Sequence, residues 1–185
     1  MKVRISSGTS LTLTASQAEG NSYWGDGNLE ITDTNPTFYS GITSFSGLTG
    51  NLVFDGAITL SGGNVRLTAS QADGLSISGS GNVIIKSKSI SADTDLSDID
   101  ATHIYFGKTG TTVNVASGAT LTLNVDQLAS TTIKGSGTTS ISDTIANLIA
   151  DAGSHVSGSI DVNVKDSASV SDLTTIQSYT SGTLS

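Results

Sequence analysis

The stretch LTASQAEG at residues 13–20 returns as LTASQADG at residues 67–74, and a more divergent copy, LNVDQLAS, occupies residues 123–130. The copies stay aligned beyond this stretch, through a Gly-x-Gly corner and an apolar run: GDGNLEI at 25–31, GSGNVII at 79–85 and GSGTTSI at 135–141. The first two copies are 54 residues apart, and the second and third are 56 residues apart. Such a period indicates structural units that bury a continuous core only by stacking on their neighbours.

Short apolar runs bounded by Gly, Ser, Asn or Asp, at intervals of roughly eight to twelve residues, are typical of an all-β sandwich, barrel or solenoid. A sandwich does not need its sequence to recur, whereas every coil of a solenoid faces the same environment. We therefore predict a mainly β fold, a parallel β-solenoid (β-helix) with short helices at some coil corners. It would be a single elongated repeat domain over residues 1–185, excised from a longer chain, with copies at about 3–56, 57–112 and 113–185.

The period is too long for one coil, so each copy is expected to hold two or three coils. Alternate side chains of a strand point inward, and we expect three equivalent apolar pairs to form one stacked inner row: Leu11 and Leu13, Val65 and Leu67, and Leu121 and Leu123. Arg66 should face water. The Gly-x-Gly corners should use positive φ, which glycine adopts at little steric cost.

Helix signals are short. ASQAEG and ASQADG each predict about one and a half turns of helix, with Ser as the cap and Gly as the stop. A longer helix is expected over Thr144–Ala152, capped by Asp143 or Ser142 and ended by Gly153. A further helix is expected after Ser171, with Leu173 and Ile176 facing inward.

The composition excludes several classes of function. A formal net charge of −8 and a pI near 4.3 argue against nucleic acid and against docking on anionic lipid, because both need clustered Lys and Arg. No apolar run is long enough to span a bilayer, and MKVRISSGTS lacks the apolar core of a signal peptide. Without cysteine, zinc-thiolate, disulfide and Cys-nucleophile chemistry are excluded. We expect a soluble extracellular or cell-surface protein with no membrane insertion.

Two motifs, ISDTIANL at residues 141–148 and VKDSASVSDLTTI at residues 164–176, resemble the repeat regions of giant bacterial secreted and surface proteins. These are adhesin-like, type I-secreted or S-layer-like repeat proteins, and LTASQADGLSISGSG at residues 67–81 is similar to them too. The resemblance implies extracellular display more than any reaction. The GGxGxDxUx nonapeptide of the calcium β-roll is missing from the sequence.

Four carboxylates are close together in the sequence: Asp93, Asp95, Asp98 and Asp100. Such a loop suits Ca²⁺ and also resembles the carboxylate pair of a hydrolase. We favour turns and helix caps instead, since Asp-Thr also occurs at residues 33–34 and 143–144. His103 and His155 lack a metal-binding spacing and are interpreted as surface or corner residues. No catalytic residue, metal ligand or cofactor is predicted, with calcium as the alternative.

Six of the nine aromatic residues precede residue 55. Tyr23, Trp24, Phe38 and Tyr39 are the candidate ligand-binding residues, because aromatic rings with polar handles stack on sugars. The other interpretation is that these rings plug one end of the solenoid.

We therefore predict a non-enzymatic extracellular structural module, a stiff spacer or layer component, whose partners are neighbouring repeats or further copies of itself. The alternative is an adhesin segment that binds a carbohydrate or a surface through its aromatic N-terminal third. A β-helical polysaccharide lyase or hydrolase would need paired acids beside clustered basic residues, and the sequence does not show that pattern.

Substituting Leu67 with Asp tests the inward placement of this residue. A charge in the row of buried side chains should disrupt several coils at once, because an unpaired buried carboxylate is costly. We expect a large loss of β signal and of melting temperature in circular dichroism. A variant as stable as the parent chain would contradict the placement.

Overall fold

The computed structural model describes residues 1–108 and 110–185. The protein is mainly β, with 44% strand and 16% helix. Its residues form two compact units: residues 1–88 and 98–110 make the N-terminal unit, and residues 89–97 and 111–185 make the C-terminal unit. The border between the units crosses the second sequence copy. The prediction of one elongated domain over residues 1–185 stays a prediction.

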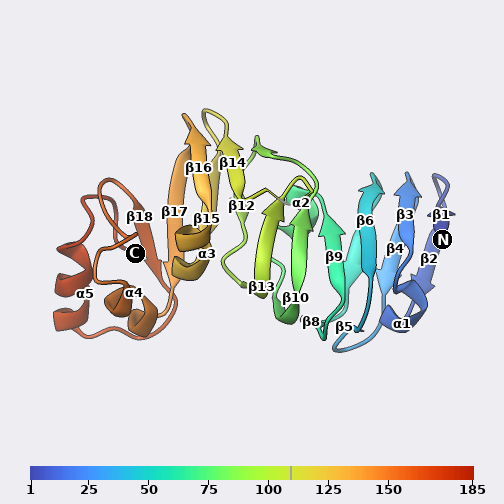
Figure 1. Cartoon of the computed structure of the whole chain (residues 1–185), viewed down its shortest axis with the longest axis horizontal. Helices are drawn as coiled ribbons and strands as arrows, with labels where there is room; N and C mark the ends of the chain where they lie inside the picture. The colour runs from blue at the N-terminus through green and yellow to red at the C-terminus, as the bar shows by residue number, and fades with distance from the viewer. Residues whose placement is uncertain (109) are drawn as a thin grey trace. The chain divides into compact units, whose positions relative to one another are not determined.

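The strands of the N-terminal unit form two curled sheets, in which all strand pairs are parallel (Figure 1). Sheet A contains β1 (Lys2–Arg4), β3 (Ser22–Gly25), β6 (Ile42–Leu48), β9 (Asn64–Leu67), β10 (Ile77–Ile85), β8 (Ile58–Leu60) and β5 (Thr37–Phe38), with β13 (Ile99–Phe106) paired to β10. Sheet B contains β2 (Ser10–Leu13), β4 (Asn28–Ile31) and β7 (Leu52–Phe54). Parallel neighbours need a crossover of a dozen or more residues, so each strand pairs with one from the next turn of chain.

The C-terminal unit repeats this arrangement in two smaller parallel sheets. Sheet C contains β11 (Ser89–Ile90), β14 (Thr112–Val115) and β16 (Thr132–Gly135). Sheet D contains β12 (Thr94–Asp95), β15 (Thr120–Leu123), β17 (Thr138–Asp143) and β18 (Asp161–Val164). The mainly β, parallel character predicted from the sequence is confirmed.

The three repeated stretches each begin a helix: α1 (Ala15–Ala18), α2 (Ala69–Ala72) and α3 (Val125–Ser130). In all three the N-cap side chain accepts a hydrogen bond from the backbone N–H of a Gln, and that Gln side chain accepts one from the N-cap backbone N–H. The pairs are Thr14 with Gln17, Thr68 with Gln71, and Asn124 with Gln127. This reciprocal capping box satisfies two N–H groups that a helix start would leave unpaired.

Helices occur at the first two repeat stretches and within Thr144–Ala152, as expected, whereas α3 was not expected, and the predicted caps are wrong. Thr, not Ser, caps α1 and α2, because the residue before Ala has the extended backbone that a cap needs. Likewise Thr144, not Asp143 or Ser142, caps α4 (Ile145–Asp151). The predicted Gly stops are confirmed by φ values of 70°, 67° and 77° at Gly20, Gly74 and Gly153. The final helix, α5 (Val170–Gln177), is capped by Ser169.

The prediction of one inner row shared by the three copies is wrong. β2, β9 and β15 belong to three different sheets. Instead, each inward Leu pairs with an Ile of its own copy, and the same pairing occurs three times: Leu13 with Ile31, Leu67 with Ile85, and Leu123 with Ile141. A turn of chain is shorter than the sequence period, so the neighbour stacked on each Leu comes from the next turn. Leu67 and Leu123 are fully buried, and Leu13 is half-buried.

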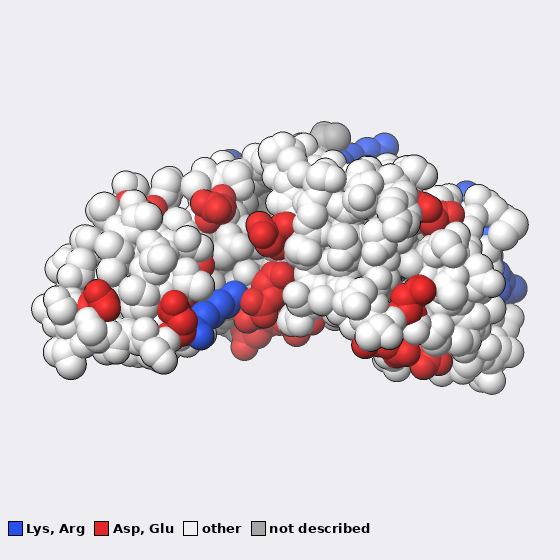
Figure 2. Space-filling view, turned by 90° about the horizontal axis from the view of Figure 1, so that it is seen from below, with Lys and Arg blue, Asp and Glu red and all other residues white. Residues whose placement is uncertain are grey.

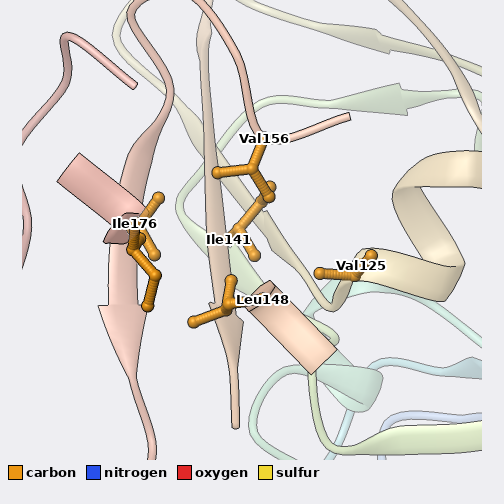
Figure 3. Close-up of a cluster of buried hydrophobic side chains, with 6 residues drawn as sticks. Val125, Ile141, Leu148, Val156 and Ile176 are labelled. Carbon is orange, nitrogen blue, oxygen red and sulfur yellow. The ribbon is translucent and has the colours of Figure 1, made fainter. Parts of the chain in front are cut away.

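Each unit has its own core. Phe45 is central in the N-terminal unit, since its ring stacks on Tyr23 at 5.6 Å between centroids and meets Phe54 edge-on at 5.5 Å. In the C-terminal unit a cluster of aliphatic side chains joins strands to helices (Figure 3): Val125, Ile141, Leu148, Val156, Val162 and Ile176.

Both the backbone conformation and the space available require glycine at the Gly-x-Gly corners. Gly25, Gly79 and Gly135, equivalent in the three copies, have φ values of 109°, 111° and 103°. A Cβ atom on Gly79 would lie 2.4 Å from the carbonyl oxygen of Leu60, and one on Gly135 would lie 2.1 Å from that of Val115. These distances are far below van der Waals contact. Backbone of one turn therefore passes directly over the next at each corner.

Gly79→Ala should destabilise the chain much more than Gly74→Ala. Both residues have positive φ, but a Cβ atom at Gly74 meets nothing within 4 Å. Gly74→Ala should therefore lower the free energy of unfolding by about 1–2 kcal/mol, the cost of placing a residue with a Cβ atom in the left-handed conformation. Gly79→Ala adds a backbone clash and should cost about 3 kcal/mol or more. Urea unfolding of the two variants measures the difference, and equal midpoints would contradict the close stacking.

Candidate functional site on the outer face of sheet A

Strand register places one residue from each of six adjacent strands of sheet A side by side, and all of them except the buried Ile84 are half-buried or exposed. Residues paired in succession along this row are Lys2, Ser22, Ser44, Arg66, Ile84 and Tyr105. Arg4, Trp24 and Gly47 form the start of a second row beside it. The residues between them in sequence, such as Tyr23 and Val65, are buried, as the alternation of a strand requires. Arg66 points outward, as predicted.

Basic side chains gather on this face. Six of the eight Lys and Arg residues of the chain line two hollows of about 540 and 510 Å³, and Lys86 lines both. We define the basic face by these side chains together with Trp24: Lys2, Arg4, Arg66, Lys86, Lys88 and Lys108. Ser22, Ser44 and Ser46 line the first hollow among them. The basic face thus combines charge, hydroxyl groups and one large ring.

The cations of the basic face lack carboxylate partners. Within residues 1–108 and 110–185, no acidic side chain forms an ion pair with any of the six. The Arg4 guanidinium lies over the Trp24 ring, 5.1 Å from its centroid, in a cation–π contact. Lys86 Nζ donates to the carbonyl oxygen of Ser46 at 3.0 Å. The Nε atom of Arg66 is screened from solvent and has no hydrogen-bond partner in the described part of the chain.

Carboxylates of the N-terminal unit accept hydrogen bonds from backbone N–H groups instead. Glu19 accepts hydrogen bonds from the backbone N–H groups of Tyr39 and Ser40, and Asp33 accepts one from the N–H of Ala15 at the start of α1. Figure 2 shows acidic side chains gathered on the face toward the viewer, while the basic side chains of the N-terminal unit appear only along its margin. Opposite charges are thus separated within a unit of six basic and eight acidic residues.

The four predicted ligand-binding aromatic residues have two different environments. Tyr23 and Phe38 lie in the core, with 2% and 0% exposure, and burial raises the pKa of Tyr23. Trp24 and Tyr39 are 46% and 62% exposed. Trp24 lies on β3 within the basic face, whereas Tyr39 follows β5 at the other end of the strand order of sheet A. The structure therefore does not bring the four rings into one platform, and ligand binding by Trp24 and Tyr39 stays a prediction.

The carboxylates at residues 93–100 are divided between the two units. Asp93 accepts from the N–H of Thr120 at 2.8 Å and Asp95 from that of Ser97 at 2.9 Å, as turn and capping residues do. Asp98 and Asp100 belong to the N-terminal unit and are exposed. Among the described residues, no group of three or more His, Asp or Glu could hold a metal ion. Calcium binding stays an untested alternative.

The two histidines occupy separate units. His103, on β13, contacts Tyr105 edge-on at 5.5 Å between ring centroids. His155 follows α4, and its Nδ1 atom lies 2.7 Å from Asp151 Oδ1. Asp151 Oδ2 also accepts from the N–H groups of His155 and Val156, both at 2.9 Å. Burial disfavours the charge on Asp151, but these hydrogen bonds outweigh burial and hold its pKa below the usual value.

Sequence reasoning missed the basic face. The six cations are spread over residues 2–108 of an acidic chain, and the net charge hides them. The sequence does show that such cations alternate with apolar residues, as in Val65-Arg66-Leu67, and this alternation assigns the cation to the outer side of its strand. The order of the strands in sheet A was not visible. That order decides which cations become neighbours.

Comparisons with family models, curated proteins and solved structures find no match to this chain. In the described residues, no helix is both long enough and apolar enough to cross a membrane. The resemblance to secreted repeat proteins therefore stays a prediction.

Asp151 should make stability fall at acid pH. Its pKa is lower in the folded chain than the ordinary Asp value near 3.8. Its contribution is thus fully present above that value and is lost as the pH falls through the folded pKa. Asp151→Asn should lower the melting temperature at pH 6 and flatten its decline below about pH 4. Asp126→Asn, at an exposed position in α3, is the control and should keep the parent's decline. An unchanged decline in Asp151→Asn would contradict this role.

Proposed function

We propose that this chain is a non-enzymatic structural repeat module of an extracellular or cell-surface protein, built as a parallel β-solenoid. Its role is that of a stiff spacer or layer component, and its partners are further modules of the same kind. The observation that carries this proposal is the threefold recurrence of one local unit. Strand, capping-box helix and inward Leu–Ile pair return in each copy with the same register.

The parallel ladders support the solenoid. Asn64 and Asn82, 18 residues apart, lie on adjacent strands, and the Asn64 side chain accepts from the backbone N–H of Asn82 at 2.8 Å. Ladders of this kind join each turn to the next throughout sheets A to D. In repeat proteins, stability is approximately the sum of such nearest-neighbour contacts, so turns can be added without a new core.

Three carboxylates form hydrogen bonds that join one turn of chain to the next, and this use differs from catalysis. Asp33, Asp143 and Asp166 each accept a hydrogen bond from the first backbone N–H of a helix in the preceding turn, respectively in α1, α3 and α4. For Asp143 and Asp166 the N···O distances are 3.0 and 2.8 Å. A carboxylate at a helix N-terminus also interacts favourably with the helix dipole. These recurrent contacts favour a mechanical role for the acidic residues.

The outer side of α5 supports association with a further module. In the C-terminal unit α3 packs on α4, and α4 packs on α5. The next position in this series is uncovered: Val170 is 82% exposed. Together with Leu173 and Leu184 it lines a hollow of about 500 Å³. The N–H of Val170 has no acceptor among the described residues, whereas α1, α3 and α4 receive an Asp at this position. We infer that a further module of the same kind covers this side of α5.

Val170→Asp should weaken self-association at least tenfold, because an interface that covers Val170 would bury an unpaired charge. Sedimentation velocity over a concentration series measures the effect. Ser171→Asp is the matched control, since it adds the same charge at the neighbouring exposed residue, outside the residues that line the hollow. A parent chain that is monomeric at all concentrations would overturn the inferred association. So would a Val170→Asp variant that associates like the parent.

A further inference from the structure

We propose that the basic face binds a linear polysaccharide of uronic acid units, whose carboxylates contact the six cations of this face. This activity goes beyond a spacer role, because it assigns a ligand to the outer face of sheet A.

The basic face is elongated across the strands of sheet A. β1, β3, β6, β9, β10 and β13 are successive neighbours, so the row from Lys2 to Tyr105 crosses six adjacent strands. Neighbouring strands lie about 4.8 Å apart. Lys2 and Arg66, three strands apart, are therefore separated by about 14 Å, and the whole row is about 24 Å long. A row of this length suits an extended polymer better than a compact small molecule.

The charges of the basic face are available to a ligand. None of its six cations is neutralised by a carboxylate within the described residues, in a chain with twice as many acidic as basic residues. Arg66 lines the second hollow, and its solvent-screened Nε atom has no hydrogen-bond partner among the described residues. An anion in the hollow beside Arg66 would supply acceptors to this guanidinium, since Arg binds carboxylates through two parallel hydrogen bonds.

The other side chains of the face match a sugar. Ser22 and Ser44 are half-buried residues in the row itself, where their hydroxyl groups can donate to and accept from sugar hydroxyls. Ser44 Oγ already lies 3.3 Å from Ser46 Oγ. The exposed Trp24 ring offers an apolar surface for sugar C–H groups, and the Arg4 guanidinium over it holds the ring in place.

The charge balance favours a polyuronate over nucleic acid. A DNA duplex carries one charge per about 1.7 Å of its axis. The net charge of −8 therefore repels it strongly outside the basic face. A polyuronate carries at most one charge per sugar and many neutral hydroxyl groups. That composition matches cations interspersed with serines.

The test uses the full chain and immobilised polygalacturonate in biolayer interferometry. We expect binding that weakens as salt increases. Arg66→Met keeps the aliphatic packing and Lys86→Gln is on an exposed residue. Each substitution should raise the Kd for polygalacturonate about tenfold. Lys134→Gln, which removes one charge from the C-terminal unit, is the matched control and should bind like the parent. Trp24→Ala should weaken binding without changing its salt dependence. Equal melting temperatures establish that the variants are folded.

Three ligands separate the outcomes. Fully methyl-esterified polygalacturonate has the same sugars without charge and should not bind. Equal binding of this ester would overturn the role of the cations. Tighter binding of single-stranded DNA than of polygalacturonate would assign the face to nucleic acid instead. No binding of polygalacturonate, or an equal loss in Lys134→Gln, would also overturn the proposal. None of these results bears on the self-association test, so the spacer role stands or falls separately.

Discussion

Close stacking of one turn of chain on the next is the constraint on which the rest of the structure depends. At the Gly-x-Gly corners the backbones approach so closely that a Cβ atom on Gly79 would lie 2.4 Å from a carbonyl oxygen of the neighbouring turn. The same stacking places a carboxylate of one turn at the helix start of the turn before, as Asp143 does for Val125. Residue types that often indicate catalysis are thus used here to join turns.

A stack of parallel strands also creates surfaces that no single segment of the chain contains. Each turn contributes one or two outward side chains to sheet A, and the register places those of successive turns side by side. Arg66 and Lys86 are 20 residues apart in sequence, yet both line the same hollow. A weak basic signal per turn becomes a concentrated positive face. The chain as a whole remains acidic.

The end of the C-terminal unit and the side of the N-terminal unit therefore have different chemistry. The outer side of α5 presents apolar residues such as Val170, which suits another module of the same kind. The basic face presents six cations and the exposed Trp24 ring, which suits a charged polymer. Because the two surfaces share no residue, a layer or spacer component could associate through one and hold a matrix polysaccharide through the other.

The sequence by itself determined the local units, because their causes are local. Capping residues, Gly stops and two-residue alternation act within a few positions, so the short helices, the positive φ of Gly79 and the burial of Leu67 followed from it. Only the tertiary structure decided which turn stacks on which. Leu67 pairs with Ile85, not with its counterparts in the other copies, because β2, β9 and β15 belong to three different sheets. The basic face was decided in the same way, since charges far apart in sequence become neighbours only through the order and register of the strands.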